Sequence, residues 1–391
     1  MNKPKVVHLI NVDVGVRVHL RNQLHYLKRK GYEVTAICPP GPLVSSDGVT
    51  PEGIPVRTVP MSRDIRPWDD LRTILQLVRI FRTERFDIVH THSVKPGLLG
   101  RLAARLVGVP CIVHTVHGLL LHEGMSWRSR WLWWMSEKVG ATLGDYMLSQ
   151  SRQDMAILVE QNICRVEKLG YLGNGIDLCQ FDPTVITQQE VEATRQALGV
   201  NNQEKVIALV GRLSVEKGCL EFTEMARCIH RRYPATKFWL IGRQETDKAG
   251  RLGVEDIITD DMQSYVRYLG LRSDMPRLYA AMDILVFPSH HEGMPRSLME
   301  ASAMGKAIVA TDIRGCQEVV IKDVTGLLVP VRDSNSLVRA VSTLLDNPAL
   351  THRLGRAARA HAQQHFDERV YFQRLNATYE HLLQECGIVS K

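Results

Sequence analysis

The chain of 391 residues lacks the features that mark several large classes of protein. No apolar run is long enough to cross a bilayer, and the first apolar stretch, 6–12, is shorter than the apolar core of a signal peptide and is interrupted by His8 and Asn11. The eight cysteines are scattered and include no C-x-x-C pair, which indicates a reduced compartment and argues against a disulfide scaffold. We therefore expect a cytoplasmic protein, either soluble or peripheral to a membrane.

Two phosphate-binding signatures are also missing. The sequence contains no G-x-x-x-x-G-K-[ST], so it has no Walker A loop, and no G-x-G-x-x-G follows an expected strand, which counts against a dinucleotide-dependent oxidoreductase. With 45% hydrophobic and 23% charged residues, the composition also excludes disordered and collagen-like chains. A globular protein with a substantial core remains.

Positive charge is distributed unevenly along the chain. Residues 1–180 hold 23 Lys and Arg against 16 Asp and Glu, whereas residues 181–391 hold 26 of each kind. The whole excess therefore lies in the first half, as a basic face on one domain would give. Nucleic acid, an anionic membrane surface and a phosphorylated substrate are the partners that such a face fits.

Short β-type runs alternate with helical patterns, which predicts an α/β fold with parallel sheets covered on both faces. In the first half, strands are expected at 6–12, 32–37, 87–91, 110–115 and 145–149, and helices at 18–30, 68–84 and 97–107. Turn residues concentrate at 170–183, and strands then recur at 206–210, 237–241, 284–287, 307–310 and 327–329. We expect two doubly wound, Rossmann-like domains, 1–176 and 177–368, followed by a C-terminal helix at 369–391. A ligand would bind in the cleft between them, at the carboxyl ends of the strands.

A cationic segment follows the expected strand at 206–210. Arg212 and Lys217 lie five residues apart, and Gly218 opens the next helical pattern. The free N–H groups of that helix would point at the same place, where Arg212 could grip phosphate oxygens and Lys217 could add a point charge. The segment predicts an anion site, although a lone Arg and Lys are more often solvated residues of an ordinary loop.

Two glutamates follow the expected strand at 284–287. Pro295 suits the first turn of a helix, which leaves Glu292 in the loop and Glu300 on the helix. Eight helical residues rise about 12 Å, so the two carboxylates would meet different parts of a long ligand. Alone, the pair carries little weight, since Glu292 as a helix cap and Glu300 in a surface ion pair would explain it. Beside an anion site, carboxylates that accept from sugar hydroxyls indicate a nucleotide-sugar site.

Together these motifs resemble those of the retaining glycosyltransferases of family 4, which have the GT-B fold of two facing Rossmann-like domains. The matching segments are Glu292 to Glu300 with Gly293 and Pro295, then 211–218, 174–177 and 326–329. The segments 90–97 and 115–118 are similar to those of bacterial members that build cell-surface polysaccharides, often on a lipid-diphosphate-linked acceptor.

The sequence departs from the family pattern at two places. The first phosphate loop of the family usually carries a glycine pair, whereas the segment 13–17 has only Gly15. Arg243 and Gln244 follow Gly242, where an acidic residue and a glycine are common. The first departure leaves the donor contacts of the N-terminal loop uncertain.

The resemblance implies a role for each matching residue. Residues 1–176 would bind the acceptor and 177–368 the nucleotide sugar, and the C-terminal helix would pack back towards the first domain. Arg212 and Lys217 would neutralise the donor diphosphate, so no metal or other cofactor is needed. The implied catalytic residues are His117, Arg212, Lys217 and Glu292. The implied donor-binding residues are Gly15, Arg212, Lys217, Glu292, Gly293, Met294, Pro295 and Glu300, with Glu292 beside the sugar and Glu300 beside the ribose.

Several histidines gather on two neighbouring expected strands. His90 and His92 share one strand face, and His114 and His117 end the next run, so a zinc site is conceivable. No matching cysteine or carboxylate cluster accompanies them, and packed or cleft-facing histidines are the preferred interpretation. For His117, a place at the strand end in the core is the alternative to the cleft.

Four of the six tryptophans fall within nine residues, at Trp127, Trp131, Trp133 and Trp134, and are interleaved with cations. On a helix they would form an aromatic surface that suits a bilayer interface and the acceptor side of the protein. Packing under the first sheet and a dimer contact are the alternatives.

These observations predict a metal-independent, retaining glycosyltransferase, peripheral on the inner face of the membrane. It would move a hexose or N-acetylhexosamine from a nucleotide sugar, UDP-linked, to a lipid-linked or other hydroxyl acceptor, with no nucleic-acid partner. A nucleotide-sugar 2-epimerase of similar fold would bind the same donor but turn over without an acceptor. A basic, non-enzymatic binding module is the other alternative.

Overall fold

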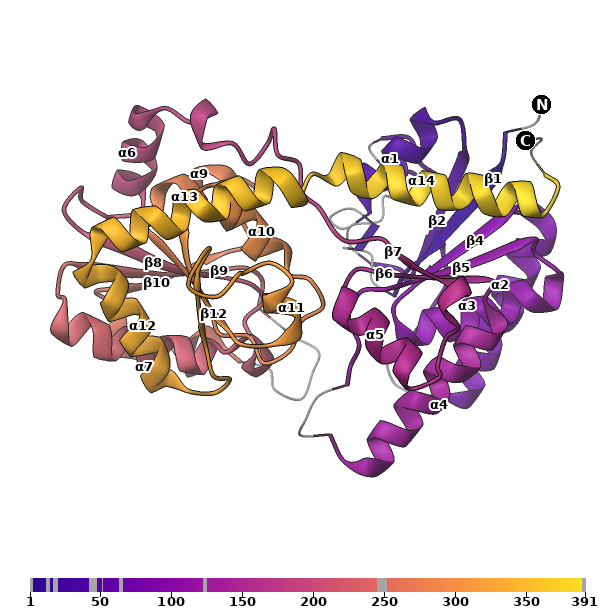
Figure 1. Cartoon of the computed structure of the whole chain (residues 1–391), viewed down its shortest axis with the longest axis horizontal. Coiled ribbons are helices and arrows are strands. Elements are labelled where there is room, and N and C mark those ends of the chain that lie inside the picture. The colour runs from indigo at the N-terminus through magenta and orange to yellow at the C-terminus, as the bar shows by residue number, and fades with distance from the viewer. Residues whose placement is uncertain are drawn as a thin grey trace. The chain divides into compact units, whose positions relative to one another are not determined.

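The structure, a computed structural model, describes residues 3–11, 15–16, 20–41, 48–50, 52–62, 66–121, 125–244 and 252–388. The chain forms two compact units, one of Met1–Gly173 with Tyr371–Lys391 and the other of Asn174–Val370 (Figure 1). The first boundary between the units lies between residues 173 and 174, within the expected turn region, whereas the sequence prediction put it between 176 and 177. The second boundary lies inside the last helix, between residues 370 and 371, whereas the sequence prediction put it between 368 and 369. The last helix therefore belongs to both units.

The first unit contains a seven-stranded, fully parallel sheet in the order β3-β2-β1-β4-β5-β6-β7. Its strands are β1 (Lys5–Leu9), β2 (Glu33–Cys38), β3 (Val56–Thr58), β4 (Ile88–His92), β5 (Cys111–Val116), β6 (Tyr146–Ser149) and β7 (Leu169–Tyr171). The edge strands β3 and β7 were not expected, because each has only three residues and a run of that length gives little periodic signal.

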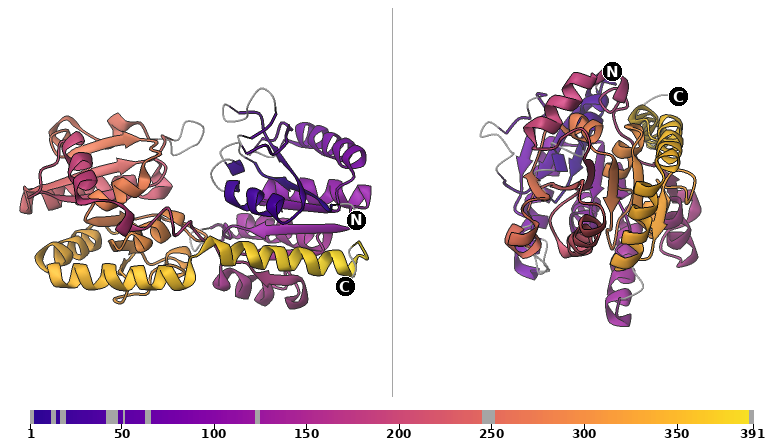
Figure 2. Two further views of the ribbon diagram at one scale, coloured as in Figure 1. Left: turned by 90° about the horizontal axis from the view of Figure 1, so that it is seen from above. Right: turned by 90° about the vertical axis from the view of Figure 1, so that its left-hand side faces the viewer.

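Helices cover both faces of this sheet (Figure 2). α1 (Arg21–Arg29) and α14 (Glu368–Glu385) pack on the face that carries Val6 and Ile88. α2 (Pro67–Glu84) and α3 (Val94–Val107) pack on the face that carries Val7 and Val89. α4 (Trp127–Leu143) contacts α3, and α5 (Arg152–Glu160) contacts β6 and β7. Burial on both faces explains the nearly continuous apolar strands.

The second unit contains a six-stranded parallel sheet in the order β10-β9-β8-β11-β12-β13. Its strands are β8 (Lys205–Val210), β9 (Thr236–Ile241), β10 (Val266–Gly270), β11 (Ile284–Phe287), β12 (Ala307–Thr311) and β13 (Leu327–Val329). All but the edge strand β10 were expected. The two parallel sheets confirm the predicted α/β fold class.

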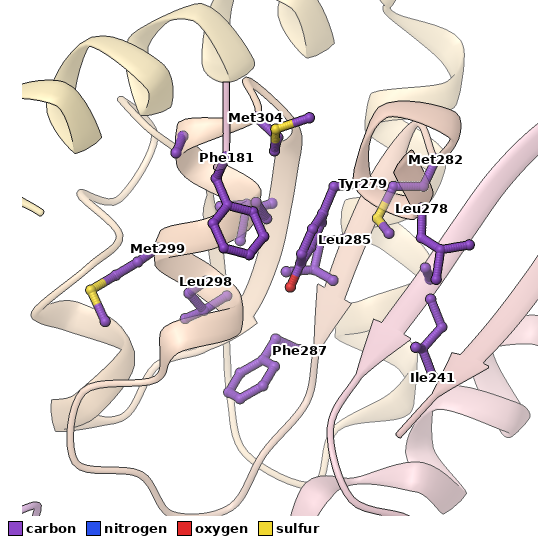
Figure 3. Close-up of a cluster of buried hydrophobic side chains, with 14 of the residues drawn as sticks. Phe181, Ile241, Leu278, Tyr279, Met282, Leu285, Phe287, Leu298, Met299 and Met304 are labelled. Carbon is purple, nitrogen blue, oxygen red and sulfur yellow. The ribbon is translucent and has the colours of Figure 1, made fainter. Parts of the chain in front are cut away.

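Helices also cover both faces of the second sheet. α7 (Cys219–Arg232) and α12 (Ser334–Asp346) pack on one face. α9 (Met275–Ala281), α10 (Arg296–Ala303) and part of α13 (Pro348–His365) pack on the other, where Leu298 and Met299 of α10 lie in one core with Tyr279 and Leu285 (Figure 3). The remaining elements are α6 (Gln188–Ala197), α8 (Val254–Ile257), α11 (Arg314–Gln317) and single 3₁₀ turns at Val166–Lys168, Pro183–Val185, Val215–Lys217 and Asp260–Met262.

The strand order of each sheet reverses direction once, between β1 and β4 in the first unit and between β8 and β11 in the second. At such a reversal the connections from two adjacent strands leave on opposite faces, which opens a crevice at the carboxyl ends of the strands. The loops that begin at residues 211 and 288 meet at this point in the second unit. They are the two loops in which the sequence predicts an anion site and a glutamate.

The four tryptophans of α4 do not form one surface. Trp127 and Trp131 are 74% and 55% exposed, whereas Trp133 is 6% exposed and lies in a hydrophobic core. Trp134 is half-buried, and its indole N–H donates to the carbonyl oxygen of Gln161 at 3.0 Å. The expectation that all four face a membrane or acceptor is therefore wrong for Trp133. Helical spacing explains the split, because residues four apart share a face.

None of the helices within the described residues is long and apolar enough to cross a membrane.

Candidate functional site

The loop that follows β8 turns sharply back towards β11. It contains Arg212 and a 3₁₀ turn, Val215–Lys217, and it ends at Gly218, which has φ +69° and precedes α7. A Cβ atom at Gly218 would lie 2.1 Å from the carbonyl oxygen of Pro288. Glycine is required here both for the left-handed backbone and for this close approach.

Hydrogen bonds fasten this loop to the loop after β11. The His290 backbone N–H donates to the carbonyl oxygen of Glu216 at 2.8 Å, and Ser289 Oγ lies 3.2 Å from the same oxygen. The Thr311 hydroxyl, at the end of β12, donates to the carbonyl oxygen of Ser289 at 2.5 Å. Three adjacent strand ends are thereby tied together, and none of these side chains was identified from the sequence. Their position directly after a strand at the reversal point is the signal that could have found them.

Lys217 and Glu292, from these two loops, form an ion pair. Their side chains are 17% and 13% exposed, and the Ser289 hydroxyl donates to the same Glu292 oxygen at 2.8 Å. The Lys217 ammonium also lies 5.9 Å from the centre of the Phe287 ring. The sequence placed these two charges on different parts of a ligand, whereas the structure places them in contact, so each affects what the other can bind.

The backbone after Glu292 is held from several sides. The Asn174 side-chain amide donates to the carbonyl oxygen of Met294, and the Arg296 guanidinium donates to the carbonyl oxygen of Gly175, both at 3.1 Å. A Cβ atom at Gly315 would lie 2.5 Å from the carbonyl oxygens of residues 292 and 293. The segment 174–175, which matches the family at the domain junction, thus supports this loop.

Pro295 precedes α10 as its N-cap residue, one position before the first turn where we expected it. Proline has no N–H group, so the donors of the segment 293–295 are the N–H groups of Gly293 and Met294. No side chain caps the start of α10. Its first N–H groups are therefore available to an anion or a hydroxyl oxygen.

Glu300 lies on α10 with Tyr279 and Arg296 as neighbours. The Tyr279 hydroxyl donates to Glu300 Oε2 at 3.0 Å, and Arg296 Nε lies 3.9 Å from Oε1. Burial raises the pKa of the Glu300 carboxyl above its ordinary value of 4.5, and these two neighbours oppose the shift. When ionised, the carboxylate is a strong acceptor for hydroxyl groups.

A second acid–base pair lies beside the two loops. His290 Nε2 is 2.7 Å from Glu221 Oε1, in the first turn of α7. Burial alone would raise the pKa of Glu221, but the hydrogen bond to His290 and other neighbours hold it below the ordinary value. Glu221 is therefore a carboxylate that fixes the His290 ring, and sequence reasoning missed both residues.

Gly15 and His117 belong to the first unit, whereas the other candidate residues belong to the second. The carbonyl oxygen of Gly15 accepts from the Leu20 N–H at 2.9 Å, and the expected loop partners Asp13, Val14 and Arg17 lie outside the described residues. His117 follows β5, with Nε2 2.9 Å from His92 Nδ1. Burial lowers the pKa of His117, and a hydrogen bond to Gln150 opposes this.

The buried histidines of the first unit include three that could together hold a metal ion. Nitrogen atoms of His8, His90 and His92 all lie within 4.8 Å of one another. The sequence analysis did not group His8 with the other histidines, because β1 and β4 are far apart in the chain and become neighbours only through the strand order of the sheet.

Two family models match the chain. The model "Glycosyl transferase 4-like domain" matches residues 14–175, and the model "Glycosyl transferases group 1" matches residues 190–361. The first match falls almost entirely in the first unit and the second in the second unit.

Curated relatives cover nearly the whole chain. A UDP-Gal:alpha-D-GlcNAc-diphosphoundecaprenol alpha-1,3-galactosyltransferase of Escherichia coli is 29% identical, over 89% of this chain and 90% of its own. The capsular polysaccharide biosynthesis glycosyltransferase CapM of Staphylococcus aureus is 26% identical, over 98% of this chain and 99% of its own.

Solved structures share the fold. A glycosyltransferase of Rickettsia africae superposes with a TM-score of 0.79 at 21% identity, covering 98% of this chain and 100% of its own. HepE of Anabaena, in complex with UDP and glucose, superposes with a TM-score of 0.77 at 20% identity, covering 96% of this chain and 99% of its own. The chain therefore belongs to the glycosyltransferase family that these two models describe, and it has the GT-B fold.

Proposed function

We propose that this glycosyltransferase transfers a hexose or N-acetylhexosamine from a UDP-sugar to a hydroxyl group of a lipid-linked acceptor, with retention at the anomeric carbon and without a metal ion. The observation that carries the proposal is the pairing of Lys217 with Glu292 where the loops after β8 and β11 meet. Arg212 lies in the same loop as Lys217. Cations beside carboxylates suit a ligand that combines a diphosphate with hydroxyl groups.

The leaving group of the reaction is a nucleoside diphosphate, whose negative charge grows as the sugar departs. Arg212 and Lys217 would stabilise that charge, and the uncapped N-terminus of α10 would add N–H donors. Fixed cations of this kind supply what a divalent ion supplies in other transferases, and this supports a metal-independent reaction. No group of the second unit is proposed as a covalent nucleophile.

The two glutamates would bind different hydroxyl groups of the donor. Glu300, with Tyr279 donating to one oxygen, would accept from the ribose hydroxyls through its other oxygen. Glu292 would accept from the sugar, and the N–H groups of Gly293 and Met294 would donate to sugar or phosphate oxygens. Diphosphate binding would have to draw Lys217 partly away from Glu292. That release would expose the carboxylate to the sugar as the donor arrives.

The first unit would bind the acceptor and the membrane. The Escherichia coli relative and a relative of Campylobacter jejuni, 27% identical, both have names that specify a sugar-diphosphoundecaprenol acceptor. Residues 1–180 carry the entire positive excess of the chain, and α4 exposes Trp127, Trp131 and Leu132. Cations near an anionic leaflet contribute about 1 kcal/mol each, and exposed tryptophans suit headgroup depth.

The proposed reaction is tested with a panel of UDP-sugars and undecaprenyl-diphosphate-linked sugar acceptors. We expect UDP release that depends on the acceptor, persists in EDTA, and yields a product with the anomeric configuration of the donor by proton NMR. Turnover without any acceptor would indicate an epimerase instead. Loss of transfer on chelation, with recovery in Mg²⁺ or Mn²⁺, would contradict the role given to Arg212 and Lys217.

Removing the lysine of the ion pair and removing the charge of its glutamate should change UDP affinity in opposite directions. Lys217→Ala should weaken UDP binding by about 1.5–3 kcal/mol, as should Arg212→Ala, because each removes a charge-assisted contact. Glu292→Gln should tighten UDP binding by about 0.5–1.5 kcal/mol, because the carboxylate no longer competes for Lys217, and should still slow sugar transfer. Isothermal titration of UDP measures both effects.

The matched control for this pair is Lys237 with Glu204, an ion pair at the opposite end of the second sheet. Lys237→Ala and Glu204→Gln should leave UDP affinity unchanged. If Glu292→Gln weakens UDP as strongly as Lys217→Ala does, the two residues do not compete and the assignment is wrong.

Acidification should weaken donor binding through Glu300. The ionised carboxylate accepts from ribose, and its pKa is raised above 4.5, so affinity should fall at a higher pH than for an ordinary carboxyl group. UDP-glucose is the suitable probe, since its esterified diphosphate does not titrate in this range. Glu300→Gln should bind it more weakly at neutral pH and lose this pH dependence. A variant that keeps the wild-type profile would remove Glu300 from the ribose site.

Membrane docking should depend on the exposed tryptophans of α4. The double variant Trp127→Ser with Trp131→Ser should remain folded but sediment less with anionic phospholipid vesicles. Trp133→Phe, the matched control, should bind vesicles like the wild type, and Trp133→Ala should lose about 3–5 kcal/mol of folding stability because that ring is buried. Wild-type protein that does not bind anionic vesicles would refute the docking proposal.

A further inference from the structure

A single file of hydrogen-bonded side chains crosses the buried face of the first sheet, beneath α14. It starts at His117, whose Nε2 lies 2.9 Å from His92 Nδ1, and His92 Nε2 in turn lies 3.0 Å from His8 Nδ1. These three rings come from the loop after β5 and from β4 and β1. No step of the proposed transfer uses His92 or His8.

The file continues through the C-terminal helix. His8 Nε2 lies 3.3 Å from the hydroxyl of Tyr379 on α14, and that hydroxyl lies 2.5 Å from His90 Nδ1. His90 Nε2 is 2.7 Å from the hydroxyl of Thr115 on β5, which ends the file. Each ring is therefore bonded at both nitrogens, and the only additional contact within the described residues of the file is Gln23 Nε2, at 3.5 Å from His8 Nδ1.

The three histidines at the start of the file meet edge to edge. The His8 and His92 rings have centres 5.3 Å apart and planes inclined by 16°, and the His92 and His117 rings have centres 5.1 Å apart and planes inclined by 34°. With facing nitrogens at 3.0 and 2.9 Å, such spacing places one ring at the end of the next. This is the arrangement in which an N–H of one ring points at the lone pair of its neighbour.

The number of protons on these rings limits which nitrogen of each histidine can donate a hydrogen bond. His8, His90, His92 and Tyr379 are fully buried, so their partners are the neighbouring protein groups. Burial lowers the pKa of His8 to about 3 and lowers those of His90 and His92 well below 6.5, so these rings are neutral. A neutral imidazole has one N–H donor and one acceptor nitrogen. Each ring must therefore accept on one side and donate on the other.

We infer that all protons of the file point in one direction, so that His8, His90, His92 and His117 share one tautomer, and that Tyr379 is a positioning residue that fixes the tautomer of His117. If Tyr379 donates to His8, every histidine of the file carries its proton on Nδ1. If Tyr379 donates to His90, every histidine carries it on Nε2. A mixture would leave two donors or two acceptors facing each other without water, at a cost that neither direction incurs.

A metal ion is the rival occupant of this cluster. Zinc requires each ligand nitrogen at about 2.0–2.1 Å, with lone pairs that converge on the ion. The facing nitrogens of His8 and His92 are directed at each other across 3.0 Å. His90 stacks on His92, with ring centres 4.4 Å apart and planes inclined by 22°, so their in-plane lone pairs run side by side. The hydrogen-bonded file fits these orientations better than a shared ion does.

The shared tautomer matters for the ligand side of His117, and this step rests on the proposed function. Nε2 of His117 faces His92, so Nδ1 is the nitrogen that the Gln150 side chain and any ligand must share. One direction of the file makes Nδ1 a donor, and the other makes it an acceptor. Residues of β1, β4 and α14 would thereby decide what His117 offers to the donor sugar or its diphosphate.

The inference is tested first on the unaltered protein. Selective ¹⁵N labelling of histidine and long-range ¹⁵N–¹H NMR at neutral pH report the protonated nitrogen of each ring, and through-bond couplings between facing nitrogens report the links directly. We expect four neutral rings with one common tautomer, all Nδ1–H or all Nε2–H. Mixed tautomers, a protonated ring, or zinc that copurifies and binds to these rings would overturn the inference.

The role of Tyr379 is tested by its removal. Tyr379→Phe deletes the link between His8 and His90, so we expect the His117 resonances to show both tautomers and kcat for transfer to fall several-fold at unchanged KM for the donor. Asn376→Ala is the control: Asn376 is a buried polar residue of the same helix whose side-chain amide donates to Glu380 Oε1 at 2.9 Å. It should leave the His117 tautomer unchanged.

Each outcome bears on one part of the inference. A Tyr379→Phe protein with an unchanged His117 tautomer would refute the positioning role. If that variant fails to fold, the wild-type tautomers of His8 and His90 decide whether Tyr379 links the two rings, since two different tautomers would refute the link. A common tautomer in a wild-type protein that transfers no sugar would retain the hydrogen-bonded file and refute the proposed function instead.

Discussion

The close approach of the loops after β8 and β11 is the constraint on which the candidate donor site depends. It is possible only because residue 218 has no side chain, and it is maintained by the hydrogen bond from the His290 N–H to the carbonyl oxygen of Glu216. The approach brings a lysine and a glutamate from different strands into contact, in surroundings where both are mostly buried. In such surroundings a charge interacts strongly with its neighbours and is costly to leave unpaired. The pair is therefore satisfied in the free protein, and a charged ligand must exchange partners with it.

The two units of the chain differ in where their polar and charged side chains lie. In the second unit, charged groups gather where strands end and solvent or ligand can reach them. In the first unit, histidines occupy the interior of β1 and β4, positions that parallel strands normally fill with apolar residues. Their cost is offset because each ring finds two partners, and for His8 and His90 one of these partners is Tyr379, on a helix from the far end of the chain. The C-terminal segment is thus part of the core of the first unit and of its polar network.

The helix α4 shows how an accurate compositional signal can still be assigned to the wrong side chains. Its tryptophans are clustered in sequence, but helical geometry directs Trp133 inward and Trp127 and Trp131 outward. The exposed pair remains a candidate for an interface, whereas the buried ring contributes to a core with residues of α5 and β6. The composition of this segment indicates that the helix carries aromatic side chains, and only the packing of the helix determines which of them are accessible.

The sequence alone determined the fold class, most strands and the identities of the cationic and acidic loops, because periodicity and turn chemistry are local and the motifs lie directly after strands. It did not determine the edge strands β3, β7 and β10, or the contact between Lys217 and Glu292, which lie 75 residues apart. It also could not bring His8 to His92 or Tyr379 to His90, since these contacts follow from strand order and from the path of the last helix. Local rules fix what each segment is, whereas the partners of buried polar groups are chosen by the whole chain when it excludes water.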